Sequence, residues 1–258
     1  MHFHLPKPLH GWREFAGEVG IIVLGVLIAL GAEQIVVSIH DRHAASQAEA
    51  DIRAELAQNA AYAVERVATG DCVRAALIDL RQRLLASDEQ WAGLEDVPIR
   101  GTARTITNSL YAFPRPFSAP RRLWRSDTWS ANTAALDSID RSTYARLEEL
   151  HAMVDFFDRF QDRELIDYAR LMPLMVPQRL DPVARLQLLT VLGEADTENA
   201  NIERLAAVFL AAARDSGIAP DRQWLDRVLP TQSRSRGACV RRGPALDIAI
   251  RAEGLGQR

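Results

Sequence analysis

The longest run of apolar residues lies close to the amino-terminal end of the chain. No polar side chain occurs from Val19 to Ala32, and apolar residues continue on both flanks, so the apolar segment covers residues 15–39. A helix of these 25 residues is about 37 Å long, which exceeds the ~30 Å hydrocarbon core of a bilayer. Trp12, just before the segment, suits a membrane–water interface. The pattern predicts a short tail over residues 1–14 and a transmembrane helix over residues 15–39.

Two acidic and two small residues share one face of this predicted helix. Glu18, Gly25, Ala29 and Glu33 follow one another at helical spacing along one side. Gly25 and Ala29 form a small-xxx-small pair of the kind that lets two membrane helices approach closely. The face therefore predicts association of membrane helices, and through it a homo-oligomer. The alternative is that both glutamates only end the apolar run and lie among lipid headgroups.

Two other interpretations of the apolar segment stay open. It could be a cleaved signal peptide, because Ala29-Leu30-Gly31 has small residues at the spacing of a cleavage site. However, Glu14 and Glu18 offset the positive charge that precedes a signal peptide's apolar region. The segment could also be a helix in the core of a soluble protein. Because the apolar character continues past any cleavage point, we expect a retained anchor.

The amino-terminal pattern resembles a known group of proteins. Residues 11–40 contain WREFAGEVGIIVLGVLIALGAEQ, in which Gly-Glu precedes an apolar run with Gly-x-Leu-Ile-Ala-Leu. This segment is similar to the amino terminus of bacterial membrane-anchored proteins of unknown function. The resemblance implies a protein of the bacterial inner membrane with a single span and a helical extramembrane part. It implies no activity.

Two cysteines, Cys72 and Cys239, are the only ones in the chain. Their spacing does not match a metal site, so we expect an intrachain disulfide, which requires an oxidising compartment. Positive charges near the two ends of the span are balanced and do not decide its orientation. The short tail and the cysteine pair favour a periplasmic location for the large domain. Two free buried thiols are the alternative.

After the predicted span, apolar residues keep helical spacing over most of residues 40–229. The first series is Ala45, Ala48, Ile52, Leu56, Ala60, Val64 and Val67, and the second is Val73, Leu77, Leu80 and Leu84. Gly70-Asp71 predicts a break between these two series. Helix starts are predicted at Asp127, Asp140, Asp181-Pro182 and Asp221, with a possible break at Gly193. The fold class is therefore all-α, a transmembrane helix followed by an antiparallel helical bundle.

Two segments lack this periodicity. Residues 88–126 contain four prolines and scattered aromatic residues, which predicts one long irregular loop with a short helix or strand near Thr102 to Tyr111. A helix that begins at Asp221 should end at Leu229, before Pro230. The remainder, residues 230–258, is predicted to be an irregular, arginine-rich tail.

The net charge of −3 gives no sign of nucleic-acid binding, yet the charge is unevenly distributed. Arginines without acidic neighbours accumulate in the loop, where the candidate surface for an anion or a partner protein comprises Arg115, Arg121, Arg122, Trp124 and Arg125. Aromatic and arginine side chains together bind anionic headgroups or acidic proteins. The alternative is that the arginines neutralise the acidic helices of the same fold.

No sequence motif assigns a catalytic or cofactor site. The chain lacks a nucleophile elbow, a Cys-x-x-Cys pair and a glycine-rich phosphate loop. His40 with His43, and Glu148 with His151, have the spacing of metal ligands but lack further ligands. We therefore expect no catalytic residue, no cofactor and no metal.

Three functional hypotheses follow from the sequence. The first is a membrane-anchored helical interaction or scaffold module. The second is a periplasmic ligand-binding bundle of a sensor type, which would need a pocket. The third is an enzyme whose site no motif reveals, which would need an acid, a base and a nucleophile close together.

Overall fold

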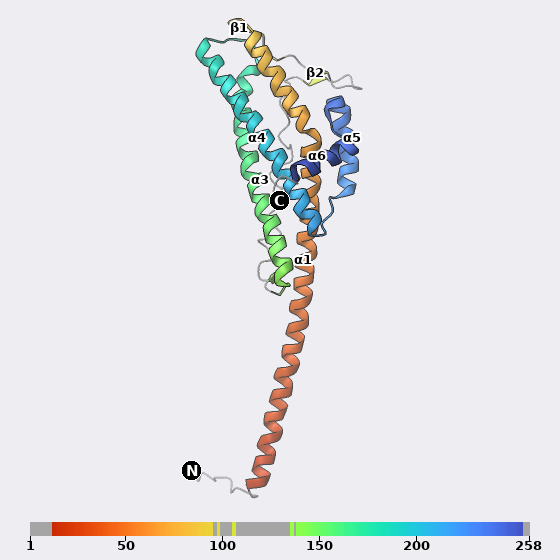
Figure 1. Cartoon of the computed structure of the whole chain (residues 1–258). Coiled ribbons are helices and arrows are strands. Elements are labelled where there is room, and N and C mark those ends of the chain that lie inside the picture. Colours follow the sequence, from red (N-terminus) through yellow and green to blue (C-terminus); the bar gives the residue numbers. More distant parts are fainter. Residues whose placement is uncertain (1–11, 95–96, 99–104, 107–134, 137, 255–258) are drawn as a thin grey trace, which may run out of the picture.

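The computed structural model describes residues 12–94, 97–98, 105–106, 135–136 and 138–254, and over them the protein is all-α (Figure 1). The helices are α1 (Trp12–Ala86), α3 (Arg141–Leu171), α4 (Pro182–Asp215), α5 (Arg222–Arg236) and α6 (Pro244–Gly254), with the 3-10 helices η2 (Met172–Met175) and η3 (Gly237–Cys239). The strands are β1 (Gln90–Trp91), β2 (Val97–Pro98), β3 (Thr105–Ile106) and β4 (Gln178–Arg179). The predicted fold class is confirmed.

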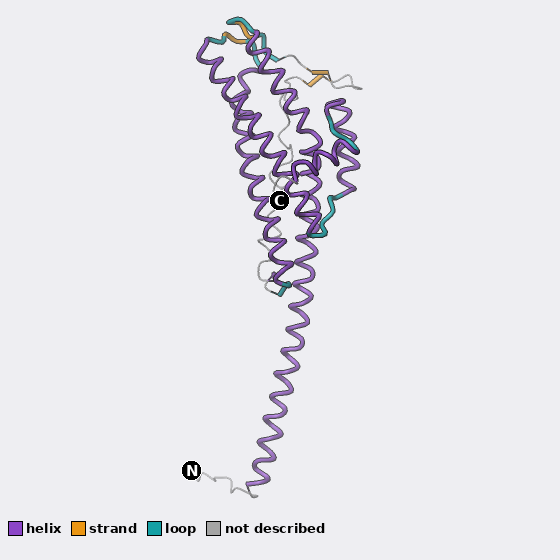
Figure 2. The backbone as a smooth tube through the Cα atoms, in the orientation of Figure 1, coloured by secondary structure: helices purple, strands orange, loops and turns teal. Residues whose placement is uncertain are grey.

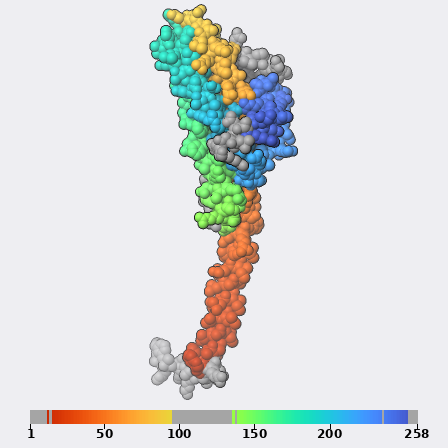
Figure 3. Space-filling view, viewed as in Figure 1, coloured from red at the N-terminus to blue at the C-terminus, as the bar shows by residue number. Residues whose placement is uncertain are grey.

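Helix α1 extends beyond the bundle and is also part of it. Every side chain from Phe15 to Ala44 is exposed, and Ala45 is the first buried one. Figure 3 shows this amino-terminal part as a bare rod below the bundle. It is the one helix, among the described residues, that is long and apolar enough to cross a membrane. Since none of its apolar stretch is buried, it is not a core helix of this bundle.

Helix α4 lies between α1 and α3 and is antiparallel to both. Ion pairs Arg163–Glu198 and Arg170–Glu194 join α3 to α4 in this direction. Both predicted apolar series of α1 are buried. From Ile52 onward the first series belongs to one core cluster, and the second series belongs to another, nearer the carboxyl-terminal end of α1. The helical spacing in the sequence therefore identified the packed face of α1.

The predicted helix starts at the three described positions are confirmed. The side chains of Asp140, Asp181 and Asp221 each accept hydrogen bonds from backbone N–H groups of the following turn. Helix α3 ends before Pro173, as predicted, and α4 continues through Gly193 without the break considered there. The start predicted at residue 127 lies outside the described residues.

The break predicted at Gly70-Asp71 is wrong, because α1 continues through it for 75 residues in all. Glycine serves close packing here. A Cβ atom on Gly70 would lie 2.3 Å from the Oε2 atom of Glu203, which belongs to α4. The missing side chain lets the carboxylate of α4 lie directly against the α1 backbone.

The irregular tail predicted after Pro230 is also wrong over the residues that the structure describes. Helix α5 includes Pro230 and ends at Arg236, η3 follows, and α6 packs on α4. We call residues 221–254, with α5, η3 and α6, the carboxyl-terminal unit. Its anchoring combines a disulfide and polar contacts with apolar packing, in which Val240 and Leu246 are part of the core and Trp224 packs against it. Pro230 and the arginines interrupt the apolar spacing in this part of the chain, so the hydrophobic pattern alone did not predict it.

Two short strand pairs lie at the end of the bundle opposite the exposed rod, shown in orange in Figure 2. β1 pairs with β4 and β2 with β3, both antiparallel. β3 falls in the part of the loop where a short strand was considered. The indole N–H of Trp91 donates to the carbonyl of Leu174 at 2.7 Å, which fixes β1 on η2. The rest of the predicted loop, up to residue 126, lies outside the described residues.

Candidate functional site

Residues 59–70 of α1 are buried on every side of the helix. Most of them are small, but four carry polar side chains: Asn59, Glu65, Arg66 and Thr69. A buried polar group costs free energy unless it is hydrogen-bonded. Neighbouring elements should therefore supply hydrogen-bond partners. They do so around Glu65, Arg66 and Gly70.

Arg66 forms a buried ion pair with Glu164 of α3. Its Nη1 atom donates to Oε2 of Glu164 at 3.1 Å, and its Nη2 atom donates to Oε1. Asn199 of α4 accepts a further hydrogen bond from Nη2 at 3.1 Å, and the hydroxyl of Tyr168 donates to Glu164 at 2.7 Å. The Arg66 and Glu164 side chains are 2% and 0% exposed. The network thus joins three helices without contact with solvent.

The electrostatics keep Arg66 charged and Tyr168 protonated. Burial by itself lowers the pKa of Arg66, but the adjacent Glu164 carboxylate outweighs it and the pKa lies above its ordinary value. Burial and Glu164 together raise the pKa of Tyr168 well above its ordinary value, so the phenol stays a donor. Removing one partner of such a pair leaves an uncompensated buried charge, which typically costs about 3–5 kcal/mol.

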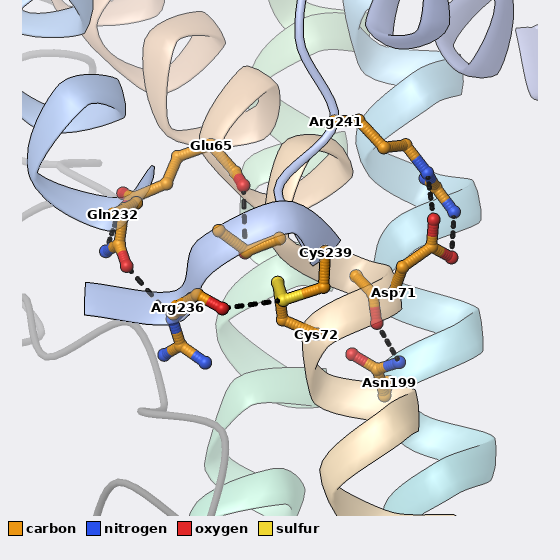
Figure 4. Close-up of a disulfide and its surroundings, with 10 residues drawn as sticks. Glu65, Asp71, Cys72, Asn199, Gln232, Arg236, Cys239 and Arg241 are labelled. Atoms are coloured by element: carbon orange, nitrogen blue, oxygen red, sulfur yellow. Dashed lines mark hydrogen bonds and ion pairs between the residues drawn. A yellow bond between two sulfur atoms is a disulfide. The ribbon is translucent and has the colours of Figure 1, made fainter. Parts of the chain in front are cut away.

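A second cluster fixes the carboxyl-terminal unit on α1, as Figure 4 shows. The backbone N–H of Arg241 donates to the carbonyl of Ala68 at 2.8 Å, and its Nη1 donates to that of Val67 at 2.9 Å. Its Nε donates to Asp71 at 2.7 Å, and Nη1 also binds Glu203. Burial by itself lowers the pKa of Arg241, but Asp71 and Glu203 outweigh it and raise the pKa above its ordinary value. One arginine therefore connects α1, α4 and the carboxyl-terminal unit.

The two cysteines of the chain lie beside this cluster and are paired as the sequence analysis expected. Cys72 of α1 and Cys239 of η3 form a disulfide with an S–S distance of 2.07 Å and a Cα–Cα distance of 5.1 Å. Both distances are normal for a cystine. Cys239 precedes Arg241 by two residues, so the covalent bond and the arginine contacts hold the same short segment against one turn of α1.

Glu65 connects α1 to α5 on the other side of the disulfide (Figure 4). The side-chain amide of Gln232 donates to Glu65, and Nε of Arg236 donates to the side-chain oxygen Oε1 of Gln232 at 3.0 Å. Burial raises the pKa of Glu65, and the Gln232 hydrogen bond and the charges of Arg236 and Arg66 only partly offset it. Glu65 is therefore an acid whose ionisation works against the fold.

The structure describes one of the two predicted surfaces and not the other. Glu18, Gly25, Ala29 and Glu33 all lie on the exposed rod of α1, and no atom lies within 4 Å of a Cβ built on Gly25. The face is thus open to a second helix. The candidate surface of Arg115, Arg121, Arg122, Trp124 and Arg125 lies outside the described residues.

The metal candidates gain no support from the described part of the chain. His40 and His43 are exposed on the rod, and Glu148 is exposed on α3. No group of three or more His, Cys, Asp and Glu side chains with metal-binding geometry occurs among the described residues. The strongest polar clusters are instead ion pairs between helices.

The sequence reasoning missed Arg66, Glu164, Glu203 and Arg241. Each pair joins residues far apart in the chain, so no local spacing indicates it. The one available signal was an arginine inside an alanine-rich, otherwise apolar helix face, since a charge there needs a buried partner.

A scan of the chain against protein-family models and searches among curated proteins and among solved structures find no match. We therefore interpret the site from its own geometry.

Proposed function

We propose that the protein is a membrane-anchored interaction module of the bacterial inner membrane, with its helical bundle in the periplasm. The observation that carries this proposal is the continuity of α1. One helix includes the exposed apolar rod over residues 15–39 and the fully buried stretch over residues 59–70. The anchor and the core of the bundle are thus parts of a single rigid element.

The exposed rod supports the membrane assignment. Apolar side chains such as Ile21, Val36 and Ile22 are 74%, 66% and 66% exposed, which is costly for a helix surrounded by water. Hydrocarbon covers such a surface without any further protein.

The disulfide supports the periplasmic side. Cystines persist in oxidising compartments and are rare where thiol reductants act. Cys72 is 6% exposed and is bonded to Cys239 in the carboxyl-terminal unit. A bundle that depends on this bond is suited to the oxidising side of the inner membrane.

The interior supports an interaction role. The ion pairs Arg66–Glu164 and Arg241–Asp71 bind α1 to α3 and to the carboxyl-terminal unit. These contacts hold α1 in one rotation about its own axis inside the bundle. Because α1 is continuous, a fixed rotation in the bundle also fixes which face of the membrane helix meets a neighbour.

A reporter experiment tests this proposal. Alkaline phosphatase fused after residue 258 should be active, and a fluorescent protein that matures only in the cytoplasm should be dark at the same position. The fusion should also remain in membranes washed with alkaline carbonate. A fluorescent, phosphatase-inactive fusion overturns the orientation, and release by carbonate overturns the anchor.

A further inference from the structure

A cleft opens on the bundle beside the carboxyl-terminal end of α4. It has a volume of about 680 Å³, which lies within the range of small-molecule sites. Buried apolar side chains from three parts of the chain form its floor: Val64 of α1, Leu210 of α4 and Ile218 of the α4–α5 connection. Half-buried Ile250 of α6 adds a fourth wall.

The rim of the cleft is basic. Arg214, Asp215 and Arg251 are its charged lining residues, so arginines exceed acids by one. Arg214 pairs with Asp215 at 3.4 Å, but both side chains are more than half exposed, and such surface pairs contribute little. Arg251 makes no hydrogen bond or ion pair with any residue in the described part of the chain. Within the part of the chain that the structure describes, this arginine beside an apolar cavity is thus available to an anion.

The position of the cleft decides between two sources of such a ligand. Val64 follows the end of the predicted span, Ile39, by 25 residues, or about 37 Å of helix. Lipids that remain in the bilayer do not reach that height. The height therefore favours a ligand from the aqueous phase over a lipid of the bilayer.

We propose that this cleft binds a small anionic amphiphile, a molecule with one apolar chain and one carboxylate, in free solution. The apolar chain lies on Val64, Leu210 and Ile218, and the carboxylate accepts hydrogen bonds from Arg251. The argument for a free ligand rests on the proposed membrane anchor, whereas the chemical class rests on the cleft itself. The ligand contacts α1, α4 and α6 at once, so binding also stabilises the carboxyl-terminal unit.

The test uses the full chain in nanodiscs of zwitterionic lipid and three probes of equal chain length: octanoate, octanol and octylammonium. Titration calorimetry, corrected with empty nanodiscs, should show octanoate binding at least about fivefold more tightly than octylammonium. Thermal unfolding should shift upward with octanoate. Binding in this assay does not depend on the cellular compartment, so its failure is distinguishable from failure of the proposed function.

Two variants and one control assign the binding to this cleft. Arg251→Gln should weaken the binding of octanoate by about fivefold and leave the binding of octanol unchanged. Ala211→Phe should fill the cleft and abolish binding of both, with the helix content and the disulfide intact. Arg242→Gln, an exposed arginine of the carboxyl-terminal unit outside the cleft lining, should have no effect.

Four results overturn the proposal. They are no octanoate binding at roughly 1 mM, equal binding of octanoate and octylammonium, no effect of Arg251→Gln, and unchanged binding in Ala211→Phe. Should Ala211→Phe fail to fold, the exposed Arg251→Gln variant and the comparison among the three probes still decide the outcome.

Discussion

At Gly70 the backbone of α1 lies against the carboxylate of Glu203, which in turn binds Arg241 and Arg74. Glycine in a helix interior costs about 1 kcal/mol relative to alanine, so its presence needs a structural reason. Here the reason is the space that the carboxylate occupies. One missing side chain allows the contact that anchors the carboxyl-terminal unit.

Gly70→Ala should destabilise the bundle by about 1–3 kcal/mol, because the new Cβ displaces a buried, hydrogen-bonded carboxylate. Gly193→Ala is the matched control, since α4 has open space around that position. It should stabilise by up to about 1 kcal/mol. Chemical denaturation of both variants checks the prediction, and stabilisation by both would contradict the packing role of Gly70.

Glu65→Gln should raise the stability of the bundle at neutral pH. Burial raises the pKa of Glu65 in the folded state, so the folded protein holds this proton more tightly than the unfolded chain. The wild type therefore loses stability as the pH rises from the ordinary glutamate value, about 4.3, through the raised pKa. Glutamine keeps an acceptor for Gln232 without the charge.

The measurement is the melting temperature of wild type and Glu65→Gln from pH 4 to pH 8. The difference should be small at the acidic end and grow toward neutrality in favour of the variant. Glu149→Gln, on the exposed face of α3, serves as the control and should show no such trend. A variant that becomes relatively less stable as the pH rises would contradict the account.

At the scale of elements, the carboxyl-terminal unit depends on its attachments to α1. Asp221 donates its backbone N–H to the carbonyl of Ala57 at one end, and Arg241 donates to that of Ala68 at the other. Tyr62 and Trp224 meet edge to face between these two points, with ring centroids 4.6 Å apart. The disulfide adds a covalent bond to this set.

Replacing both cysteines, as Cys72→Ala with Cys239→Ala, should destabilise the oxidised protein. The bond joins residues that are 167 apart in sequence. The chain-entropy model gives a stabilisation of about 5 kcal/mol for a loop of that length, and about 2–4 kcal/mol is typical of disulfides. Denaturant unfolding under non-reducing conditions measures the change. Reduced wild type should match the variant, and equal midpoints of variant and oxidised wild type would contradict a stabilising role.

The proposed membrane helix offers a further prediction. Gly25→Ile with Ala29→Ile should reduce self-association in a membrane two-hybrid assay, because two helices lose their close approach. Leu27→Ile, on the opposite side of the helix, should have little effect. If both variants associate equally, the glutamate face does not mediate association and Glu18 and Glu33 only end the apolar run.

The sequence predicted the helices well and their connections poorly, for a physical reason. Apolar spacing at Ile52, Leu56 and Val64 reports directly on burial, so the packed face of α1 was predictable. Gly70 and Pro230 are weak helix formers whose local preference tertiary contacts override. Those contacts, such as Glu203 against Gly70, join distant parts of the chain and leave no local pattern.

At the scale of the whole molecule, the single helix α1 includes the exposed apolar rod, one arginine of the buried charge network and one cysteine of the disulfide. The rod is matched to a membrane, and the cystine is matched to an oxidising compartment. Neither property depends on the other. Both support the location that we propose, the periplasmic face of a membrane, which is the central claim.

Thiol labelling of isolated membranes tests this claim most directly. The full chain is expressed in a bacterium, membranes are washed with carbonate, and a maleimide-linked polymer is added under denaturing conditions with and without reductant. We predict that the protein remains in the membrane pellet, shows no shift without reductant and gains two additions, at Cys72 and Cys239, after reduction. Recovery in the soluble fraction, or labelling of both cysteines without reductant, would contradict the account.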